Sequence, residues 1–387
     1  MWSSCRRSRN ATAAPRCKLK NGQLNEFRSA LLAWFREFQR DLPWRRSLDP
    51  YRIWISEIML QQTRVAAVIP YYEGFLEKFP DVRALAAAPE EEVLRAWSGL
   101  GYYSRARNLQ KAAKQIVAKH GGEFPRTKPE VLELPGIGEY TAAAILSIAF
   151  REQLAVLDGN VVRVLSRLDA VRGDLRGPGP WRELERRADE LLAREAAGDW
   201  NQAMMELGAT LCTPRAPECL LCPVQRFCEA RKLGIAQELP EKRNKRAVVL
   251  VQLAAAVFLD SRGNSLLLPP PTASGGNVAD DVPALVAKLW HFPTVPVRGD
   301  AGTALHEFLS REFRQVKSWK LETLDRVRHT VTYRNITVAP FLVRVKVLPR
   351  ISGAKQTGLD AITGQPISNL TRKVARSAIR KLNTSPA

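Results

Sequence analysis

The chain has 387 residues, of which 45% are hydrophobic, and a formal net charge of +20. This length leaves room for about two globular domains, and the composition is ordinary for such domains. The two ends hold much of the charge: residues 1–20 contain six basic and no acidic residues, and residues 350–387 contain seven basic residues and one acid. The smaller positive charge between them fits nucleic-acid binding without requiring it.

Membrane-spanning and secreted proteins are disfavoured. No stretch of the sequence is long and apolar enough to cross a bilayer, and the N-terminus lacks the hydrophobic core of a signal peptide. Six cysteines are too few for a disulfide scaffold at this length, so we expect a soluble protein from a reducing compartment. Residues 1–22 are basic and are expected to form a disordered arm, with a transit peptide as the alternative.

Residues 23–232 predict an all-α domain. Apolar residues recur at helical spacing in segments such as FRSALLAWFREF and RARNLQKAAKQIVAKH, and short polar or Gly/Pro-containing breaks separate these segments. The sequence therefore predicts a succession of amphipathic helices that pack on one another.

Two carboxylates in this domain have apolar neighbours. Glu57 lies in WISEIMLQQT, and Asp158 lies in AVLDGNVVRVL, with an apolar run before it and Gly-Asn behind it. Taken singly, Glu57 could be a solvated position on an amphipathic helix and Asp158 could be a helix N-cap. As a pair, apolar surroundings could keep one protonated and leave the other ionised, which is the division of roles that cleaves glycosidic bonds.

A glycine-rich turn stands between two helical segments. In LPGIGEYTA, residues 134–142, Gly136 and Gly138 allow a tight turn and bring backbone N–H groups close to a phosphate. The helix that follows adds the positive end of its dipole, so the stretch predicts a helix–hairpin–helix that contacts DNA backbone rather than bases. An ordinary turn between two antiparallel helices is the alternative.

The strongest chemical signal is a cysteine array with the spacing C-x6-C-x2-C-x5-C, formed by Cys212, Cys219, Cys222 and Cys228. Four thiolates this close in sequence can converge on one metal centre, and cysteine-only ligation suits zinc or an iron–sulfur cluster. The spacing does not choose between these two. The alternative without a metal is four unrelated buried cysteines. A catalytic redox role is disfavoured because no thioredoxin-like βαβ context surrounds the array.

The composition changes near residue 240. Residues 233–247 are polar, charged and contain a proline, so they predict a linker. Residues 248–348 contain β-like runs, VVLVQLAAAVFL and NITVAPFLVRVKVL, and one helix-like segment, GTALHEFLSREF, which together predict an α+β domain. Residues 349–387 have weak periodicity and are expected to form a basic, disordered tail.

These motifs together resemble the endonuclease III superfamily of DNA glycosylases, and within it the adenine glycosylases of the MutY type. The resemblance runs from about Leu31 to Cys228 and also includes PWRRSLDPYRIWISEIMLQQTRV and GLGYYSRARNL. It implies two helical lobes beside a cleft, a [4Fe–4S] cluster on the four cysteines, and a monomer that acts on double-stranded DNA. The implied reaction removes adenine mispaired with 8-oxoguanine or guanine, which belongs to base excision repair.

The resemblance also implies residue roles. Glu57 is expected to protonate the adenine as the general acid, Asp158 to stabilise the oxocarbenium-like sugar, and Asn160 and Tyr140 to arrange the site. Gln62 and Tyr102 fall where the family inserts side chains into the base stack. The residues implied to contact the flipped adenine or the DNA are Trp44, Arg45, Leu60, Gln61, Gln62, Tyr102, Gly136, Gly138 and Gln202.

Tyr140 separates two kinds of activity. Lyase members of the superfamily place a lysine at this position, and its amine forms a Schiff base with the sugar. A phenol cannot form that imine. We therefore expect a monofunctional glycosylase that leaves an abasic site.

The C-terminal resemblance is less continuous and covers residues 248–348. These residues resemble the Nudix-like domain with which adenine glycosylases recognise 8-oxoguanine. They contain no Glu-rich Nudix box, so pyrophosphate hydrolysis is not expected. The family's Phe-Ser-His lesion-reading loop corresponds to Val331, Thr332 and Tyr333, of which Thr332 keeps a hydroxyl. The strength of the 8-oxoguanine preference stays open, and three ordinary strand residues are the alternative.

Two rival functions remain at this point. A pyrimidine-damage glycosylase/lyase is disfavoured by Tyr140 and by the C-terminal domain, and a non-catalytic iron–sulfur DNA-binding protein is disfavoured by Glu57 and Asp158. The expected location is the cytoplasm and nucleoid of a bacterium, or the nucleus or mitochondrion of a eukaryotic cell.

Overall fold

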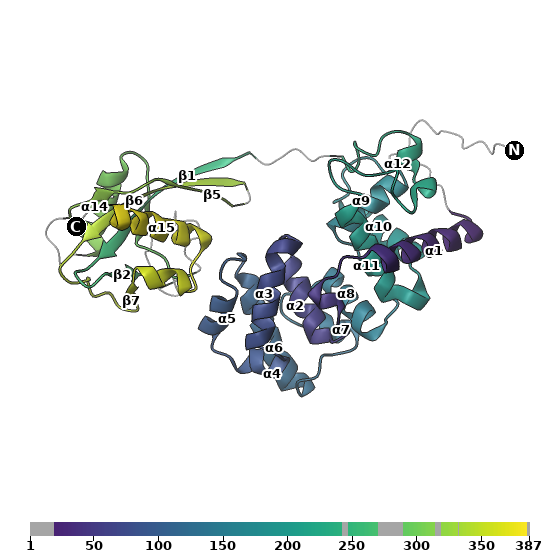
Figure 1. Cartoon of the computed structure of the whole chain (residues 1–387), viewed down its shortest axis with the longest axis horizontal. Coiled ribbons are helices and arrows are strands. Elements are labelled where there is room, and N and C mark those ends of the chain that lie inside the picture. Colours follow the sequence, from purple (N-terminus) through teal and green to yellow (C-terminus); the bar gives the residue numbers. More distant parts are fainter. Residues whose placement is uncertain (1–18, 242–246, 270–288, 314–318, 332, 385–387) are drawn as a thin grey trace. The chain divides into compact units, whose positions relative to one another are not determined.

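The computed structural model describes residues 19–241, 247–269, 289–313, 319–331 and 333–384 (Figure 1). The chain divides into two compact units. The first, here called the helical unit, runs to Ala87 and continues from Asn108 to Asn244. The second, here called the mixed unit, combines Ala88–Arg107 with the chain from Lys245 onward. The sequence pattern had placed residues 88–107 in the helical domain, whereas the structure groups them with the mixed unit.

The prediction of successive helices for the first unit is confirmed. Its elements are α1 (Asn21–Phe38), η1 (Pro43–Arg45), α2 (Pro50–Leu60), α3 (Val65–Lys78), α4 (Val82–Ala87), most of α6 (Ser104–His120), α7 (Lys128–Leu132), α8 (Glu139–Phe150), α9 (Gly159–Leu168), α10 (Pro178–Leu191), η2 (Arg194–Ala196), α11 (Ala197–Thr210), η3 (Gln225–Phe227) and α12 (Glu229–Lys232).

Helix α8 is the centre of this unit. Its residues 141–147 are all buried, because the sequence TAAAILS is apolar or small on every side and has no solvent-facing stripe. It packs against α2, α7 and α11. Helix α1 in turn covers α11 with Phe27, Leu31 and Phe35, which are spaced four residues apart and therefore share one helical face. The charged residues of α1, which are Glu26, Arg28, Arg36 and Glu37, lie outside this face.

The predicted hairpin is present as α7, a turn and α8. Thr127 and Glu130 cap the start of α7 reciprocally, with the Thr127 hydroxyl 2.6 Å from a Glu130 oxygen. Gly136 has a φ of 83°, and a Cβ at this position would lie 2.8 Å from the Cβ of Asn108. Only glycine meets both conditions, so the turn depends on Gly136 for its folding. Gly138 is the extended N-cap of α8, and a Cβ there would meet nothing within 4 Å.

The mixed unit has the predicted α+β composition. Its elements are α5 (Glu90–Ala96), β1 (Val249–Leu259), β2 (Asn264–Leu267), β3 (Thr294–Pro296), α14 (Ala301–Glu312), β4 (Glu322–Thr323), β5 (Val327–Val331), β6 (Arg334–Arg344), β7 (Lys355–Gly358), η4 (Asp360–Gly364) and α15 (Asn369–Thr384). The main sheet has the order β3-β1-β6-β4, with β5 also paired to β6, and β2 pairs with β7 in a second sheet. Strands β1 and β6 are parallel over 11 residue pairs, from Val249 opposite Arg334 to Leu259 opposite Arg344.

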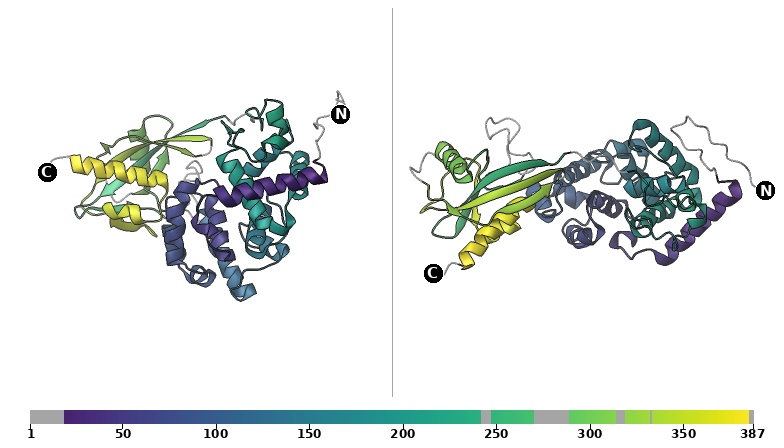
Figure 2. Two further views of the ribbon diagram at one scale, coloured as in Figure 1. Left: turned by 45° about the vertical axis from the view of Figure 1, so that its right-hand side comes forward. Right: turned by 90° about the horizontal axis from the view of Figure 1, so that it is seen from above.

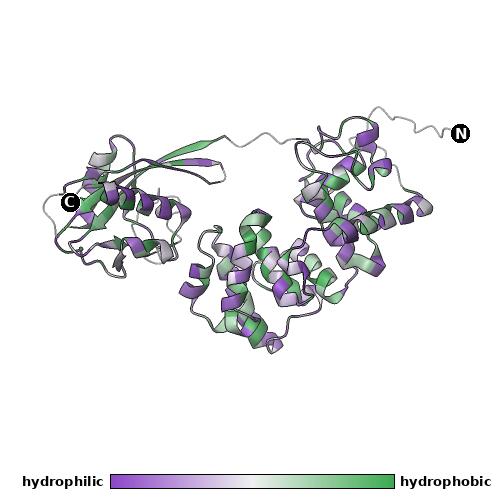
Figure 3. Ribbon diagram, viewed as in Figure 1, coloured by the Kyte–Doolittle hydropathy of each residue, from purple (hydrophilic) through white to green (hydrophobic). Residues whose placement is uncertain are grey.

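A helix covers each face of the main sheet (Figure 2, right). Successive side chains of a strand point to opposite faces, so Leu253 and Val257 of β1 pack with α15, while Ala254 and Phe258 pack with α14. Burial on both faces explains why the second half of β1 is a continuous apolar run rather than an alternating one. Figure 3 shows this hydrophobic strand and the mixture of hydrophobic and hydrophilic residues along α15.

Helix α15 corrects the sequence-based expectation for the C-terminus. Residues 349–387 were predicted to be a disordered tail, but β7, η4 and α15 fold onto the sheet, and only residues 385–387 fall outside the described ranges. Leu370, Val374, Ala375 and Ala378 of α15 are buried in the core. The prediction was wrong because this narrow apolar stripe is diluted by basic residues on the exposed side of the helix.

The other boundaries differ less. The predicted linker, residues 233–247, is shorter than expected, since Leu239 is buried against Ala230 and Ala236 of the helical unit. The basic arm, residues 1–22, lies outside the described residues up to Lys18, and its end already belongs to α1. Among the described residues, no helix combines the length and hydrophobicity needed to span a membrane.

Candidate active site

A pocket of about 460 Å³ opens in the helical unit between η1, α2, α8, α11 and the start of α9. Its volume is within the range of small-molecule sites. The sequence-predicted residues that line it are Trp44, Arg45, Glu57, Leu60, Gln61, Gln62, Tyr140, Asp158, Asn160 and Gln202. The structure thus brings together side chains that lie up to about 160 positions apart in the sequence.

Glu57 is placed by α2, which begins with Asp49 as N-cap and Pro50 in the first turn. Its side chain is only 6% exposed, so it is not the solvated helix position that was the alternative. Burial raises the pKa of Glu57 to about 7, and the nearby Asp158 carboxylate acts in the same direction. A hydrogen bond from Tyr140 and the charge of Arg45 limit the rise. Near neutral pH this carboxyl can therefore both hold and release a proton.

Asp158 serves as the N-cap of α9 and also faces the pocket. Its side chain accepts hydrogen bonds from the backbone N–H of Val161 at 2.7 Å and from the Asn160 amide at 3.0 Å. Burial raises the pKa of Asp158, while these donors stabilise the ionised form and oppose the rise. The N-cap interpretation and the functional one are therefore compatible, because capping fixes the carboxylate at the pocket wall.

Tyr140 lies one residue inside α8, directly after the glycine turn. Its hydroxyl donates a hydrogen bond to Glu57 Oε2 at 2.6 Å and lies 3.3 Å from the sulfur of Met205. Burial, followed by the two nearby carboxylates, raises the pKa of Tyr140 well above its usual value, so the phenol stays neutral. Tyr140 is thus a hydrogen-bond donor that orients Glu57.

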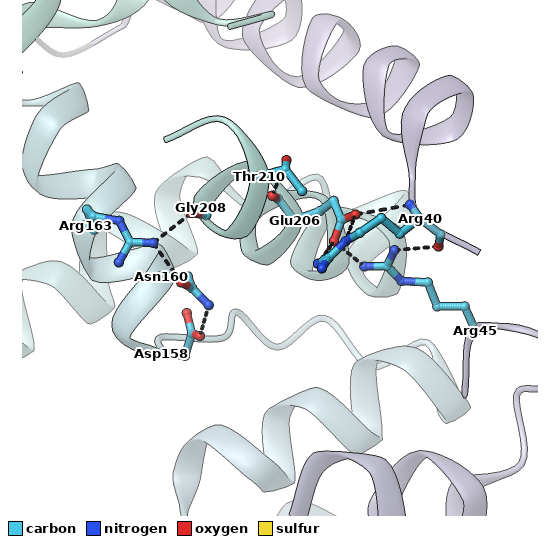
Figure 4. Close-up of polar contacts among 8 residues, drawn as sticks. All are labelled: Arg40, Arg45, Asp158, Asn160, Arg163, Glu206, Gly208 and Thr210. Atoms are coloured by element: carbon cyan, nitrogen blue, oxygen red, sulfur yellow. Dashed lines mark hydrogen bonds and ion pairs between the residues drawn. The ribbon is translucent and has the colours of Figure 1, made fainter. Parts of the chain in front are cut away.

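Glu206 lines the same pocket and was missed from the sequence. It is 1% exposed and lies 2.6 Å from Arg40 and 2.9 Å from Arg45, as Figure 4 shows. Burial alone would raise the pKa of Glu206, but the bonds from the two arginines outweigh it and lower the pKa to about 2. Arg45 also donates to the Arg40 carbonyl at 3.0 Å, so its guanidinium is held at the pocket wall. Glu206 follows Gln202 by one helical turn of α11, so both side chains lie on the side of the helix that faces the pocket.

Arg163 connects the Asp158 end of the pocket to the cysteine loop. Its guanidinium donates to Asn160 Oδ1 and to the Gly208 carbonyl, both at 2.7 Å (Figure 4). It also donates to the Cys212 carbonyl at 2.8 Å. A Cβ at Gly208 would lie 2.7 Å from the Cβ of Asn160, so glycine lets α11 approach α9 this closely. The orientation of Asn160 is therefore fixed from two sides.

The four cysteines of the array line one cavity, together with Arg167. An Arg167 nitrogen lies 3.1 Å from the Cys212 sulfur, and a second nitrogen of the same guanidinium, Nη2, is buried without a hydrogen-bond partner. Burial raises the pKa of Cys222 to about 12 and that of Cys228 to about 11, so both thiols need a bound cation to ionise. Within the described ranges, no three histidine, cysteine, aspartate or glutamate side chains are placed to hold a single metal ion. Four cysteine donors around one cavity, with the buried Arg167 guanidinium beside Cys212, fit an anionic iron–sulfur cluster.

The two residues predicted to enter the base stack are Gln62, which lines the pocket, and Tyr102, which does not. Gln62 and Tyr102 are both exposed and both have left-handed backbone, with φ of 58° and 49°. Such conformations are unfavourable for residues other than glycine, and they cluster at functional sites. Tyr102 belongs to the mixed unit, as do Val331 and Tyr333 beside the β5–β6 turn. Thr332 lies outside the described residues, so its predicted role is untested.

Comparisons with known proteins identify the family of the chain. Residues 55–192 match the family described as HhH-GPD superfamily base excision DNA repair protein. The chain is 47% identical to the adenine DNA glycosylase of Homo sapiens over 219 residues, which cover 54% of this chain but only 40% of the human protein. The adenine DNA glycosylase of Mus musculus is 36% identical over 397 residues, covering 90% of this chain and 77% of the mouse protein.

A solved structure supports the helical fold. A thermostable thymine-DNA glycosylase matches 56% of this chain and all of its own length, with a TM-score of 0.52 and 30% identity. The resemblance deduced from the sequence motifs is confirmed by these matches. The chain belongs to the adenine DNA glycosylase family, within the HhH-GPD superfamily of base excision DNA repair proteins.

Proposed function

We propose that this chain is a monofunctional glycosylase that removes adenine mispaired with 8-oxoguanine or guanine in duplex DNA. Family membership supports the adenine specificity, since the relatives that match most of the chain are adenine DNA glycosylases. The observation that carries the proposal is the buried Glu57, 2.6 Å from the Tyr140 hydroxyl and sharing its pocket with Asp158. A proton donor and a carboxylate at one site are what cleavage of an N-glycosidic bond requires.

Glu57 supplies the proton. Adenine is a poor leaving group until one of its ring nitrogens is protonated, and a carboxylic acid with a pKa of about 7 delivers that proton near neutral pH. Tyr140 orients the carboxyl through its hydrogen bond, and Arg45, fixed by Glu206, helps to define the base pocket.

Asp158 stabilises the sugar. As the bond to adenine breaks, positive charge develops on the deoxyribose, and an ionised carboxylate beside it lowers the energy of that state. The donors Val161 N–H and Asn160 keep Asp158 fixed and favour its ionised form. A transient covalent bond to the sugar is compatible with the same geometry. Water then completes the hydrolysis and leaves an abasic site.

The adenine has to leave the duplex before it can reach Glu57. Extrusion costs a few kcal/mol, and side chains that occupy the vacated stack offset part of this cost. We assign that role to Gln62 and Tyr102, which are exposed and carry strained backbone. The backbone at Gly136 and Gly138 would hold the nearby phosphates, together with the positive end of α8.

The cysteine cavity is proposed to hold a [4Fe–4S] cluster through Cys212, Cys219, Cys222 and Cys228. Such a cluster supplies structural cross-linking of the loop and fixed charge. Arg167 would neutralise charge at Cys212. Arg163 donates to both the Cys212 carbonyl and Asn160, so it links the cysteine loop to the pocket. Iron and sulfide analysis with the visible absorption spectrum distinguishes this cluster from zinc.

A panel of duplexes tests the function. Purified protein is incubated with duplexes containing A opposite 8-oxoguanine, A opposite G, A opposite T and an oxidised pyrimidine, with and without borohydride. The proposal expects release of adenine from the first two duplexes, strand cleavage only after alkali, and no trapped adduct in good yield. Cleavage at the oxidised pyrimidine with a borohydride-trapped adduct would instead support the pyrimidine-damage glycosylase/lyase.

A further inference from the structure

The loop that carries Tyr102 has an unusual backbone. It joins α5 to α6 and contains Gly99, Gly101 and Tyr102, with φ of 119°, 73° and 49°. Tyr102 is 41% exposed, although it is a large aromatic residue. Left-handed backbone at a non-glycine residue persists only where the surroundings hold it in place. The contacts that hold this loop therefore determine where the Tyr102 side chain points.

Contacts from the neighbouring helices support one side of the loop. The Trp97 indole donates to the Gly101 carbonyl at 3.2 Å, and Arg105 donates to the same carbonyl at 3.2 Å. The Arg105 guanidinium also lies 5.4 Å from the ring centres of both Trp97 and Tyr102. These contacts fix the carbonyl before Tyr102, and the Gly99 backbone N–H donates to the Tyr103 hydroxyl at 3.3 Å across the loop.

The first turn of α15 and the residue Ile367 before it contact the loop. Arg372 donates to the Ser98 hydroxyl at 2.6 Å, and the Asn369 side chain donates to the Gly99 carbonyl at 3.1 Å. The Tyr103 hydroxyl donates to the Ile367 carbonyl at 2.9 Å on the far side of Tyr102. All of these residues belong to the mixed unit, although more than 260 positions separate the two segments in the sequence.

The start of α15 is itself well defined. The Ser368 hydroxyl accepts a hydrogen bond from the Thr371 backbone N–H at 3.0 Å, which caps the helix. Asn369 and Arg372 lie one turn apart and so present their side chains on the same side of α15. A capped helical turn is a rigid support for two hydrogen-bond donors aimed at one loop.

We propose that Arg372 and Asn369 are positioning residues for Tyr102. By fixing Ser98 and Gly99, the first turn of α15 holds the loop in the conformation in which Tyr102 enters the base stack and helps to extrude the adenine. This inference rests on the proposed function. It means that the C-terminal part of the chain contributes to base extrusion through the Tyr102 loop, separately from any reading of the opposite base at residues 331–333.

Two matched controls separate loop positioning from other effects. Arg376→Ala removes the same positive charge from an exposed position one turn along α15. Lys355→Ala breaks the ion pair between Lys355 and Glu91 at 2.6 Å, which attaches α5 but does not contact the loop.

Ser98→Ala removes the acceptor of the Arg372 bond from the loop side with a minimal change in size. It serves as the second test variant if Arg372→Ala does not fold.

The experiment measures base extrusion and excision with the full-length protein. Extrusion is followed by the fluorescence of 2-aminopurine placed beside the target adenine, in an inactive Glu57→Gln background. Excision is the single-turnover rate on a duplex with A opposite 8-oxoguanine. We expect Arg372→Ala, Asn369→Ala and Tyr102→Ala each to lower the fluorescence rise and to slow excision about tenfold, whereas both controls stay within about twofold of wild type.

A double variant gives the decisive outcome. If Arg372 acts through Tyr102, then Tyr102→Ala with Arg372→Ala is no slower than Tyr102→Ala alone. The inference is overturned if the two effects multiply, or if Arg372→Ala behaves like the two controls. A wild-type protein that releases no adenine would contradict the proposed function instead, so the two failures are distinguishable.

Discussion

At the scale of single residues, the central feature is a buried carboxylic acid whose pKa is raised to about 7. Glu57 gains its raised pKa from burial, and Tyr140 limits the rise by donating to it. Asp158, in the same pocket, receives two N–H donors that favour its charged form. These environments suit Glu57 to the role of the acid and Asp158 to that of the ionised carboxylate, although burial raises the pKa of both.

This assignment predicts the pH dependence of the reaction. The protonated form of Glu57 is the active one, and it is lost as the pH rises through a pKa of about 7. The single-turnover rate should therefore fall about tenfold per pH unit above that value. DNA binding measured at each pH serves as the control. A rate that stays constant from about pH 7 to 9 while binding is unchanged would rule out Glu57 as the general acid.

Glu206 leads to a second prediction at this scale. Glu206→Gln leaves Arg40 and Arg45 without their buried carboxylate, so we expect a loss of about 3 kcal/mol in the free energy of unfolding and slower excision. The matched control is Asp199→Asn, which removes an exposed partner of Arg36 from the same helix and should cost less than about 1 kcal/mol. Urea unfolding measures both. Equal stability of the two variants would show that the buried cluster is not structurally important.

The active-site residues differ in how readily the sequence reveals them. Glu57, Asp158 and Tyr140 lie in motifs whose order along the chain is specific, so their roles could be predicted. Glu206 could not, because MMELGAT looks like an ordinary amphipathic helix and the two arginines that surround it come from a segment about 160 positions earlier. A buried ion pair formed by distant segments has no local sequence pattern.

At the scale of elements, the two glycines of the turn have different expected roles: Gly136 in folding and Gly138 in DNA binding. Gly136→Ala should lower the free energy of unfolding by about 1–3 kcal/mol, because the residue needs φ of 83° and a Cβ would collide with Asn108. Gly138→Ala should leave stability unchanged, since its backbone is extended and the space beside it is open. It should weaken DNA binding by placing a methyl group where a phosphate approaches.

Thermal unfolding and DNA-binding titrations distinguish the two variants. Each glycine is the control for the other, because both lie in the same five-residue turn and gain the same methyl group. Unchanged DNA affinity in Gly138→Ala would mean that the turn only connects two helices, which was the alternative from the sequence.

The elements also show where sequence patterns succeed and fail. The apolar strands β1 and β6 and the helix α14 were predicted, because each has a strong local signal. Helix α15 was not predicted. Its apolar stripe of Leu370, Val374, Ala375 and Ala378 is narrow, and its burial depends on the sheet against which it packs. The position of residues 88–107 in the mixed unit likewise depends on long-range contacts that a local pattern does not contain.

At the scale of the whole molecule, the proposed roles fall in two units of the chain. The helical unit holds the pocket in which we propose that the bond is broken, and the mixed unit holds Tyr102, Val331 and Tyr333. The resemblance of the mixed unit to a Nudix-like domain stays a prediction, as does the reading of 8-oxoguanine by Thr332.

The division leads to a prediction about discrimination between opposite bases. Thr332→Ala should lower the ratio of excision rates for A opposite 8-oxoguanine and A opposite G, because the hydroxyl is the remaining polar group of the proposed lesion-reading loop. Chemistry itself should be unaffected, so the rate for A opposite G is the internal control. An unchanged ratio would remove Thr332 from the site.

The central claim is that Glu57 drives the hydrolytic removal of adenine. The most direct measurement compares the wild type and Glu57→Gln in single-turnover excision on a duplex with A opposite 8-oxoguanine, with binding to the same duplex measured in parallel. The account predicts adenine release by the wild type, and at least about a thousandfold slower release by Glu57→Gln with binding largely preserved. Full excision by Glu57→Gln would contradict it.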